Sequence, residues 1–319
     1  MRYAAASERK RAIRRITRLK PEEQESFLKL LDEFAREDLD PSVREASVRT
    51  MGKAKYKAGT KTIVASLGDE RREVRLAAIS ALSELESDEA KAPLADLLKQ
   101  ADFTESDPTL GAAIRLLGKL KHKEIAPFLK EKAEAESTET AVRLAIVLYF
   151  GRAGAVEMND YLMSLVHDDD AEVITRAYAV NSVGKLKEKS RVPGLREELD
   201  KIRSLANPRE RARFSALKLQ LLTALVRLGD DSVEKELLAA ARDDDARVRV
   251  RAIGQIGEAR MEKARPLLQY IIDYDASKGA RQAAIKALKL IDGDGEDEDD
   301  DEVEPSANAA ESSGTPGGG

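Results

Sequence analysis

The chain has no cysteine, no tryptophan and only two histidines among its 319 residues. Without cysteine it can form no disulfide bond and can perform no thiolate chemistry. Six phenylalanines and seven tyrosines make up 4% of the chain, which excludes a core built on bulky rings. The remaining composition, 42% apolar and 35% charged, is too apolar for a disordered protein and is typical of small helices packed closely together.

Long hydrophobic runs are also missing. No stretch approaches the roughly 18 apolar residues that span a bilayer, and the longest uncharged apolar run is Leu144 to Phe150. The first residues, MRYAAASERKRAIRRI, lack the apolar segment of a secretory signal. We therefore expect a cytoplasmic protein, an expectation that an upstream targeting segment would change.

The residues of familiar catalytic and metal sites are scarce. His122 lies in a lysine-rich stretch, and His167 precedes Asp168-Asp169-Asp170, a run that could in principle bind a metal. The stretch AARDDDARV, from Ala240, repeats the acidic run without histidine, so we interpret both as capping turns. There is no glycine-rich phosphate loop, no G-x-S-x-G and no metal-ligand spacing. We expect no enzymatic activity, catalytic residue, cofactor or metal.

What the chain does contain is a repeat. The pattern Gly-Lys-x-Lys-x-Lys starts at Gly52, Gly118 and Gly184, which are 66 residues apart. A longer pattern underlies it, in which a Val-Arg or similar pair is followed by a small residue three or four positions later and often by glycine. It recurs every 31 to 35 residues, apart from one longer gap. Its copies begin at Val43, Val74, Thr109, Val142, Thr175, Val248 and Ala280.

A second apolar-periodic run follows each copy, as in EAKAPLADLLKQ and KARPLLQYIID. Apolar residues at i, i+3, i+4 and i+7 predict amphipathic helices, so the unit is helix, turn, helix. Proline is tolerated in a first turn, and a short carboxylate before a helix caps free amides. The prolines are Pro93, Pro127, Pro193 and Pro266, and the carboxylates are Asp40, Asp69, Asp107, Asp170 and Asp245.

The resulting D-x-x-x-x-V-R-x-x-A pattern, over about residues 38–291, resembles the HEAT-repeat family, and specifically its short bacterial, bilin-lyase-type version. The resemblance implies an all-α fold, a right-handed α-solenoid (superhelix) of about seven HEAT-like helix pairs plus a C-terminal half repeat. In such a stack each pair covers the apolar face of its neighbour. We expect an N-terminal helical cap at 1–37, the solenoid at 38–291 and a disordered, acidic Gly/Ser-rich tail at 292–319.

Three local expectations accompany this fold. The glycine that starts each lysine cluster is expected to end a helix in the left-handed conformation. The long stretch 207–229 leaves two candidates for the Val-Arg place, Ala212-Arg213 or Gln220-Leu221. The repeated arginines are expected to form a ladder to aspartates of neighbouring turns; they are Arg44, Arg75, Arg143, Arg176, Arg249 and Arg281.

Charge is unevenly distributed along the chain. The net charge is −5, and 11 acidic residues with no basic one follow from Asp292 onward, so the preceding residues sum to +6. The acidic stretch Ser83–Ala90 lies between two of the lysine clusters, whereas a nucleic-acid groove would carry one continuous sign. One hypothesis is that the acidic tail folds back on the basic first 20 residues or on the lysine clusters.

We predict a non-enzymatic scaffold or adaptor that binds another protein along the curved surface of the second helices. The alternatives are a ligand-handling subunit of the bilin-lyase type and, less favoured, nucleic-acid binding through the lysine edge. We expect a monomer, or a dimer through the uncapped C-terminal helix. Candidate partner-binding residues on the lysine edge are Lys53, Lys55, Lys57, Lys119, Lys121, Lys123, Lys185, Lys187 and Lys189, and those on second helices are Lys99, Lys130, Lys132, Arg196 and Lys201.

Overall fold

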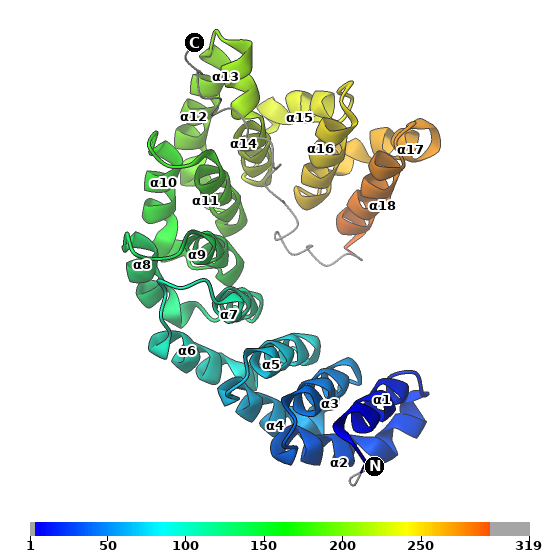
Figure 1. Cartoon of the computed structure of the whole chain (residues 1–319). Coiled ribbons are helices and arrows are strands. Elements are labelled where there is room, and N and C mark those ends of the chain that lie inside the picture. The colour runs from blue at the N-terminus through cyan, green and yellow to red at the C-terminus, as the bar shows by residue number, and fades with distance from the viewer. Residues whose placement is uncertain (1–3, 294–319) are drawn as a thin grey trace, which may run out of the picture. The chain divides into compact units, whose positions relative to one another are not determined.

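The computed structural model describes residues 4–293, and every regular element in that range is a helix (Figure 1). Two helices come first, α1 (Ala6–Ile16) and α2 (Pro21–Glu37), and both pack on α3. Helix pairs follow, and α18 (Lys278–Asp292) is the last helix of the described residues. Within these residues the expected all-α solenoid of seven helix pairs and a C-terminal half repeat is confirmed. The expected tail, 292–319, lies outside the described residues except for Asp292 and Gly293.

The seven pairs alternate a longer and a generally shorter helix. The first helices are α3 (Pro41–Lys53), α5 (Arg72–Leu85), α7 (Pro108–Lys119), α9 (Thr140–Ala153), α11 (Val173–Leu186), α14 (Ser215–Arg227) and α16 (Ala246–Glu258). The second helices are α4 (Thr60–Ala65), α6 (Lys91–Gln100), α8 (Ala126–Glu134), α10 (Asn159–His167), α12 (Val192–Ser204), α15 (Glu234–Ala240) and α17 (Arg265–Tyr274). An additional helix, α13 (Pro208–Arg213), precedes α14.

Each second helix is entered through a single 3₁₀ turn, a feature that the apolar periodicity did not predict. The prolines behave as expected, since Pro127, Pro193 and Pro266 lie at the starts of α8, α12 and α17. The 3₁₀ turns are η1 (Lys57–Gly59), η3 (Asp88–Ala90), η4 (Lys123–Ile125), η5 (Val156–Met158), η6 (Lys189–Arg191), η7 (Asp231–Val233) and η8 (Glu262–Ala264), and η2 (Ser66–Gly68) follows α4.

The described residues fall into two compact units that divide after Met158. In the first unit α3 packs on α5, α5 on α7 and α7 on α9. In the second unit α11 packs on α14, α14 on α16 and α16 on α18. The core of each unit therefore consists of the layers between successive first helices, with the second helices closing one side. No described helix has the length and apolar character that a bilayer crossing requires.

The glycines of the Gly-Lys-x-Lys-x-Lys clusters do not adopt the left-handed conformation, contrary to expectation. Gly52, Gly118 and Gly184 are buried inside their helices. The residue with positive φ lies three positions later and is a lysine in these clusters, namely Lys55, Lys121 and Lys187. The same place in other repeats is taken by Glu86, Gly154, Gly229 and Arg260, whereas the positive-φ Gly293 after α18 lies one position later.

The glycines are instead required by close approach of neighbouring first helices. A Cβ atom on Gly52 would lie 2.6 Å from the Cα atom of Ala81 on α5. A Cβ atom on Gly184 would lie 3.0 Å from the Cα atom of Ala224 on α14. Real Cβ atoms do not approach backbone as closely as 2.6 Å, so a side chain at Gly52 would push the helices apart, and one at Gly184 would force a smaller shift of its neighbour.

The left-handed residue also gives the register of the irregular sixth repeat. Arg44 precedes Lys55 by eleven residues, as Arg176 precedes Lys187, and the residue eleven before Gly229 is Lys218. Both sequence candidates for the Val-Arg place, Ala212-Arg213 and Gln220-Leu221, are therefore wrong, and Leu217-Lys218 occupies it. The reason is that the chain breaks at Phe214 into α13 and α14, so the extra residues form a separate helix before the repeat begins.

Candidate interaction surface

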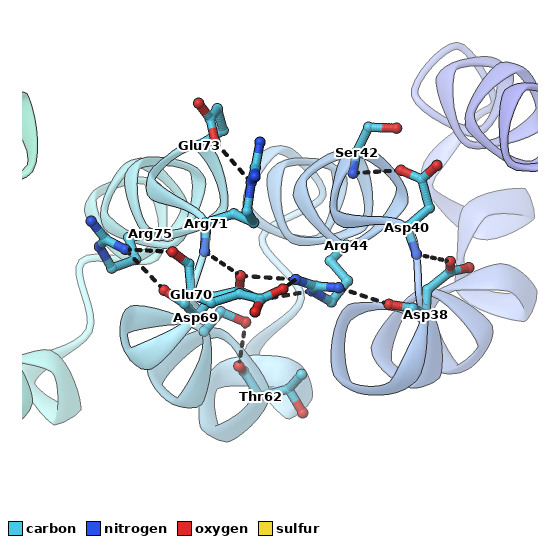
Figure 2. A network of polar contacts seen from close by, with 11 residues as sticks. Asp38, Asp40, Ser42, Arg44, Thr62, Asp69, Glu70, Arg71, Glu73 and Arg75 are labelled. Carbon is cyan, nitrogen blue, oxygen red and sulfur yellow. Dashed lines mark hydrogen bonds and ion pairs between the residues drawn. The ribbon is translucent and has the colours of Figure 1, made fainter.

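The turns that precede the first helices hold a network of arginine and aspartate side chains, drawn in Figure 2 for the first two repeats. The Nε and Nη2 atoms of Arg44 donate to the two carboxylate oxygens of Asp69 at 2.7 and 3.0 Å. Its Nη1 atom donates to the carbonyl of Asp38 at 2.9 Å. Burial would raise the pKa of Asp69, but the Arg44 hydrogen bond and the backbone N–H of Arg71 hold it below its usual value.

The same two contacts recur at the C-terminal end. Arg249 donates to both oxygens of Asp275 at 2.9 Å and to the carbonyl of Asp243 at 2.8 Å. Arg75 bonds the carbonyl of Asp69 at 3.0 Å, but its Nη2 atom stays 3.7 Å from Asp107. These arginines thus connect the turn of their own repeat to the aspartate of the next turn.

The remaining arginines of the column have other partners. Arg143 donates to backbone carbonyls of the preceding turn, among them Ala135 at 2.9 Å. Arg281, in the half repeat, donates to the carbonyls of Asp275 and Ala276. Hydrogen bonds from the arginines to backbone carbonyls of the preceding turn are therefore more general than bonds to aspartate side chains. The reason is that a backbone carbonyl is present whatever residue occupies the turn.

Arg176 differs because the turn after it offers Asn207, not aspartate. Its guanidinium is 4% exposed and pairs with Glu198 of α12, which is 2% exposed. It also donates to the carbonyl of Val166 at 3.1 Å and lies 6.0 Å from the ring centre of Phe214. A buried pair of this kind is costly to break, since either partner alone would be an uncompensated buried charge. The Nη1 atom of Arg176 also lies 3.2 Å from Asp169 of the preceding turn, so Arg176 does have an aspartate partner. The pair with Glu198 and the ring of Phe214 take the place of the aspartate of the following turn only.

The aspartates act as caps in some repeats only. Asp40, Asp107 and Asp245 are N-cap residues whose carboxylates accept the backbone N–H two positions later, each at 2.8 Å. Asp69 lies before the N-cap residue Arg71 and bonds its N–H at 2.9 Å. Asp170 is not a cap, because α11 begins after Glu172. These short contacts order the turns that carry the arginine network.

The lysine edge lies on the turns after the first helices. In the first unit Lys119 points to Glu86 of the preceding repeat, at 3.6 Å, and Lys121 donates to the carbonyl of Arg152. The other exposed edge lysines are Lys53, Lys55, Lys57 and Lys123 in the first unit and Lys187 and Lys189 in the second, while Lys185 is half-buried. Acidic and basic groups therefore alternate along the first unit's edge.

Most candidates on the second helices bind acidic groups of their own helix. Lys99 lies 3.6 Å from Asp96, Lys130 lies 3.1 Å from Glu134, and Lys201 lies 3.8 Å from Glu197, in addition to a contact with Glu198. Lys132 instead covers the rings of Phe103 and Phe128.

Arg196 stands apart from the other candidates, because it bonds across repeats to Asp230. Its Nε and Nη2 atoms lie 2.5 and 2.6 Å from the Asp230 carboxylate. The hydrogen bond from Arg196 is the main cause that lowers the pKa of Asp230 to about 2. Arg196 therefore takes part in holding α12 against the turn after α14.

The two histidines belong to separate repeats. The Nδ1 atom of His122 lies 2.8 Å from the Glu124 carboxylate, and its carbonyl accepts the hydroxyl of buried Tyr149, whose pKa is raised by burial. The Nδ1 atom of His167 lies 3.6 Å from Glu198. Across residues 4–293 no three histidine or acidic side chains are placed to hold a metal ion.

Two features were missed by the sequence reasoning. Tyr270 and Tyr274 of α17 are 62% and 72% exposed, and their rings lie 5.1 Å apart. The spacing of four residues on a predicted helix was the available signal. The second feature is a hollow of about 550 Å³ beside α13, for which the sequence carried no signal beyond the irregular length of its repeat.

Comparison with known proteins agrees with the repeat geometry. Residues 28–106, 103–182 and 202–289 match HEAT repeats. The chain belongs to the HEAT-repeat family. No curated protein sequence matches it.

Solved structures similar to this HEAT-repeat chain are diverse. Human deoxyhypusine hydroxylase is 14% identical, with a TM-score of 0.35, over 84% of this chain and 97% of that protein. The complex of CpcE and CpcF of phycocyanin lyase from Nostoc sp. is 18% identical, with a TM-score of 0.42, over 86% of this chain and 95% of that one. A karyopherin bound to the C-terminus of a protein phosphatase is 13% identical, with a TM-score of 0.43, over 85% of this chain and 34% of the karyopherin. At such low identity none of these assigns a function to this chain.

Proposed function

We propose that this HEAT-repeat chain is a non-enzymatic scaffold that binds a partner protein along the surface of its second helices. The observation that supports this is a contrast in ion pairing. The pair that links successive repeats, Arg44 and Asp69, is only 12% and 11% exposed. Most pairs within one second helix are open to solvent, as for Lys99 with Asp96, 57% and 66% exposed, and Lys130 with Glu134, 38% and 49% exposed.

The contrast separates groups that stabilise the stack from groups that are available to a partner. An exposed pair within one helix contributes about 0.3–0.5 kcal/mol, so a partner can replace it at little cost to the fold. The half-buried pairs between repeats cannot be exchanged in this way, because their loss would open the turns. A partner that contacts several second helices would therefore meet a charged surface on a framework that stays intact.

The test is capture of proteins from an extract of the native host by the immobilised chain. Lys99→Glu breaks an exposed pair on a second helix, and Arg49→Glu is the matched control, because Arg49 pairs with Glu45 at 2.6 Å on a first helix. We expect a stoichiometric protein that binds the wild type and Arg49→Glu and binds Lys99→Glu more weakly.

Equal capture by all three chains would reject the second-helix surface, and no captured protein would reject the scaffold. Visible absorbance of the purified chain provides a further check. A coloured molecule that copurifies in place of a protein would contradict the proposal in favour of a ligand-handling subunit.

A further inference from the structure

The hollow beside α13 has an apolar base. Its volume is about 550 Å³, within the range of roughly 300–1,000 Å³ that is usual for binding pockets. Ile202 of α12 and Leu219 and Leu222 of α14 line it and are themselves buried, so they form its base. Ala239 of α15 and Val248 of α16 close the other side. All of these residues belong to the second unit.

The hollow exists because the repeat is longer there. In other repeats a short turn leads from a second helix to the next first helix, whereas here Leu205 to Phe214 contains α13. Pro208, Arg211 and Ala212 of this helix line the hollow opposite α15. The insertion therefore adds a wall of its own and leaves apolar side chains of α12 and α14 at the bottom.

The rim of the hollow carries a surplus of positive charge. Three cations and two carboxylates line it: Arg203, Arg211, Lys218, Glu236 and Asp243. Glu236 lies 2.5 Å from the Arg203 guanidinium and 2.6 Å from the Lys218 ammonium, so two cations already neutralise it. The carboxylate of Asp243 accepts the backbone N–H of Asp245 at 2.9 Å.

Arg211 is the cation of the rim that remains open. It is exposed on α13, and no carboxylate within residues 4–293 holds its guanidinium. Arg209 and Arg213 lie on the same short helix against one acidic residue, Glu210. The α13 side is thus positive, and it stands over an apolar base.

We propose that this hollow binds an acidic segment of a partner protein, which inserts one side chain of leucine or phenylalanine size and places a neighbouring carboxylate on Arg211. The inference rests on the proposed function and assigns a place and a chemistry to it. An apolar anchor in a preformed hollow supplies the contact area, while the charged rim selects acidic over basic neighbours.

The first experiment uses the full chain and a fluorescein-labelled 12-residue peptide with one leucine between glutamates and aspartates. Fluorescence anisotropy at low salt measures its dissociation constant. We expect binding that weakens about tenfold when serine replaces the leucine or lysines replace the acids. Absence of binding, or equal binding of all three peptides, would overturn the inference.

Two variants connect the binding to this hollow. Arg211→Glu reverses the open charge, and Ala239→Trp fills the space from an exposed position on α15. Ala92→Trp, at an exposed alanine of α6, is the matched control, and thermal melts establish that all variants fold. We expect the first two to lose about tenfold in affinity and the control to lose none. Unchanged affinity of Arg211→Glu and Ala239→Trp would place the peptide elsewhere and refute the assignment.

The source of the acidic segment is tested with a chain that ends at Gly293. Equal affinity of this chain and the full chain supports a partner in trans. Clearly tighter binding by the shorter chain would show that residues 294–319 occupy the hollow, against the proposal.

Capture from host extract distinguishes a failure of this binding site from a failure of the proposed scaffold function. If Arg211→Glu and Ala239→Trp still capture the partner, this site is wrong and the scaffold function stands. If the wild type captures nothing, the proposed function fails whatever the peptide does.

Discussion

Gly257 of α16 lies against Ala287 of α18 so closely that a Cβ atom on the glycine would come within 2.7 Å of the Ala287 Cα atom. The same relationship joins Gly52 to Ala81 and Gly184 to Ala224. Helix backbones that approach this closely leave no room for a side chain between them. The recurring glycine is therefore a packing residue at the interface between repeats.

Substitution of this glycine should destabilise the stack. Gly257→Ala forces the backbones apart, and we expect a loss of about 1–3 kcal/mol in the free energy of unfolding. Gly254→Ala is a control in the same helix, because its added Cβ atom would meet nothing within 4 Å. That change should stabilise by roughly 0.5–1 kcal/mol, since alanine is the better helix former. Urea unfolding measures both, and equal effects would contradict the packing role.

The turn after a first helix also requires a residue with positive φ. Arg260 adopts φ of 50°, a left-handed conformation that costs a non-glycine residue about 1–2 kcal/mol. Arg260→Gly should raise the melting temperature, with a net gain of up to about 1 kcal/mol after the greater flexibility of glycine is counted.

Gly154, with φ of 75°, provides the reverse test, because nothing lies within 4 Å of its added Cβ atom. Gly154→Ala should lower the melting temperature through backbone strain alone. The two variants Arg260→Gly and Gly154→Ala should shift the melting temperature in opposite directions. Shifts of the same sign would argue against a strained turn.

The side chains of Arg44 and Asp69, which lie in successive repeats, should be energetically coupled. Charge-assisted hydrogen bonds of partly buried groups contribute about 1.5–3 kcal/mol, so we expect Arg44→Gln and Asp69→Asn each to lose stability of this order. The double variant should lose clearly less than the two losses added together, because the same contact is removed in both. Chemical denaturation of the four chains yields the coupling free energy. Simple additivity would mean that the two side chains act independently.

The pair of Arg196 and Asp230 should make stability depend on pH in acid. The pKa of Asp230 is lowered to about 2 from an ordinary value of 3.8. A carboxyl group whose pKa is lower in the folded state stabilises the fold above its unfolded pKa, and this contribution is lost as the pH falls towards 2.

Arg196→Gln should therefore be less stable than the wild type above about pH 4, and the difference should shrink between pH 4 and pH 2. Urea unfolding at half-unit pH steps follows this, with Lys235→Gln as an exposed control on α15. A difference that stays constant down to pH 2 would exclude the ion pair as its cause.

Much of the fold was predictable because it depends on periodic residues. Val43 and Arg44 and their counterparts marked each first helix, and Pro127 or Pro266 marked the start of a second one. The role of Gly52, Gly118 and Gly184 was predicted wrongly, however, because glycine can serve either close helix packing or a positive φ. Three lysines, a glutamate and an arginine occupy the left-handed place, and nothing in their chemistry indicates that.

The irregular repeat illustrates a different limit. The unusual length of the stretch 207–229 indicated an irregular repeat. The break at Phe214 and the assignment of Leu217-Lys218 to the Val-Arg place, however, depend on how α13 packs. For the same reason Arg176 pairs with Glu198 where other repeats offer an aspartate of the following turn, while it keeps Asp169 of the preceding turn as a second partner. The hollow over Ile202 and Leu222 is a product of that packing, since its walls come from five helices.

The order and type of the helices followed from local spacing, because a helix must present its apolar side chains on one face at a period of 3.6 residues. The distances between helices, the partners of the turn arginines and the open hollow were decided by the folded chain. Those features depend on contacts between residues far apart in the sequence, such as Arg44 with Asp69, 25 positions apart, and Arg227 with Asn181, 46 positions apart. A linear pattern does not encode how closely two backbones will approach, since that depends on every side chain in the interface.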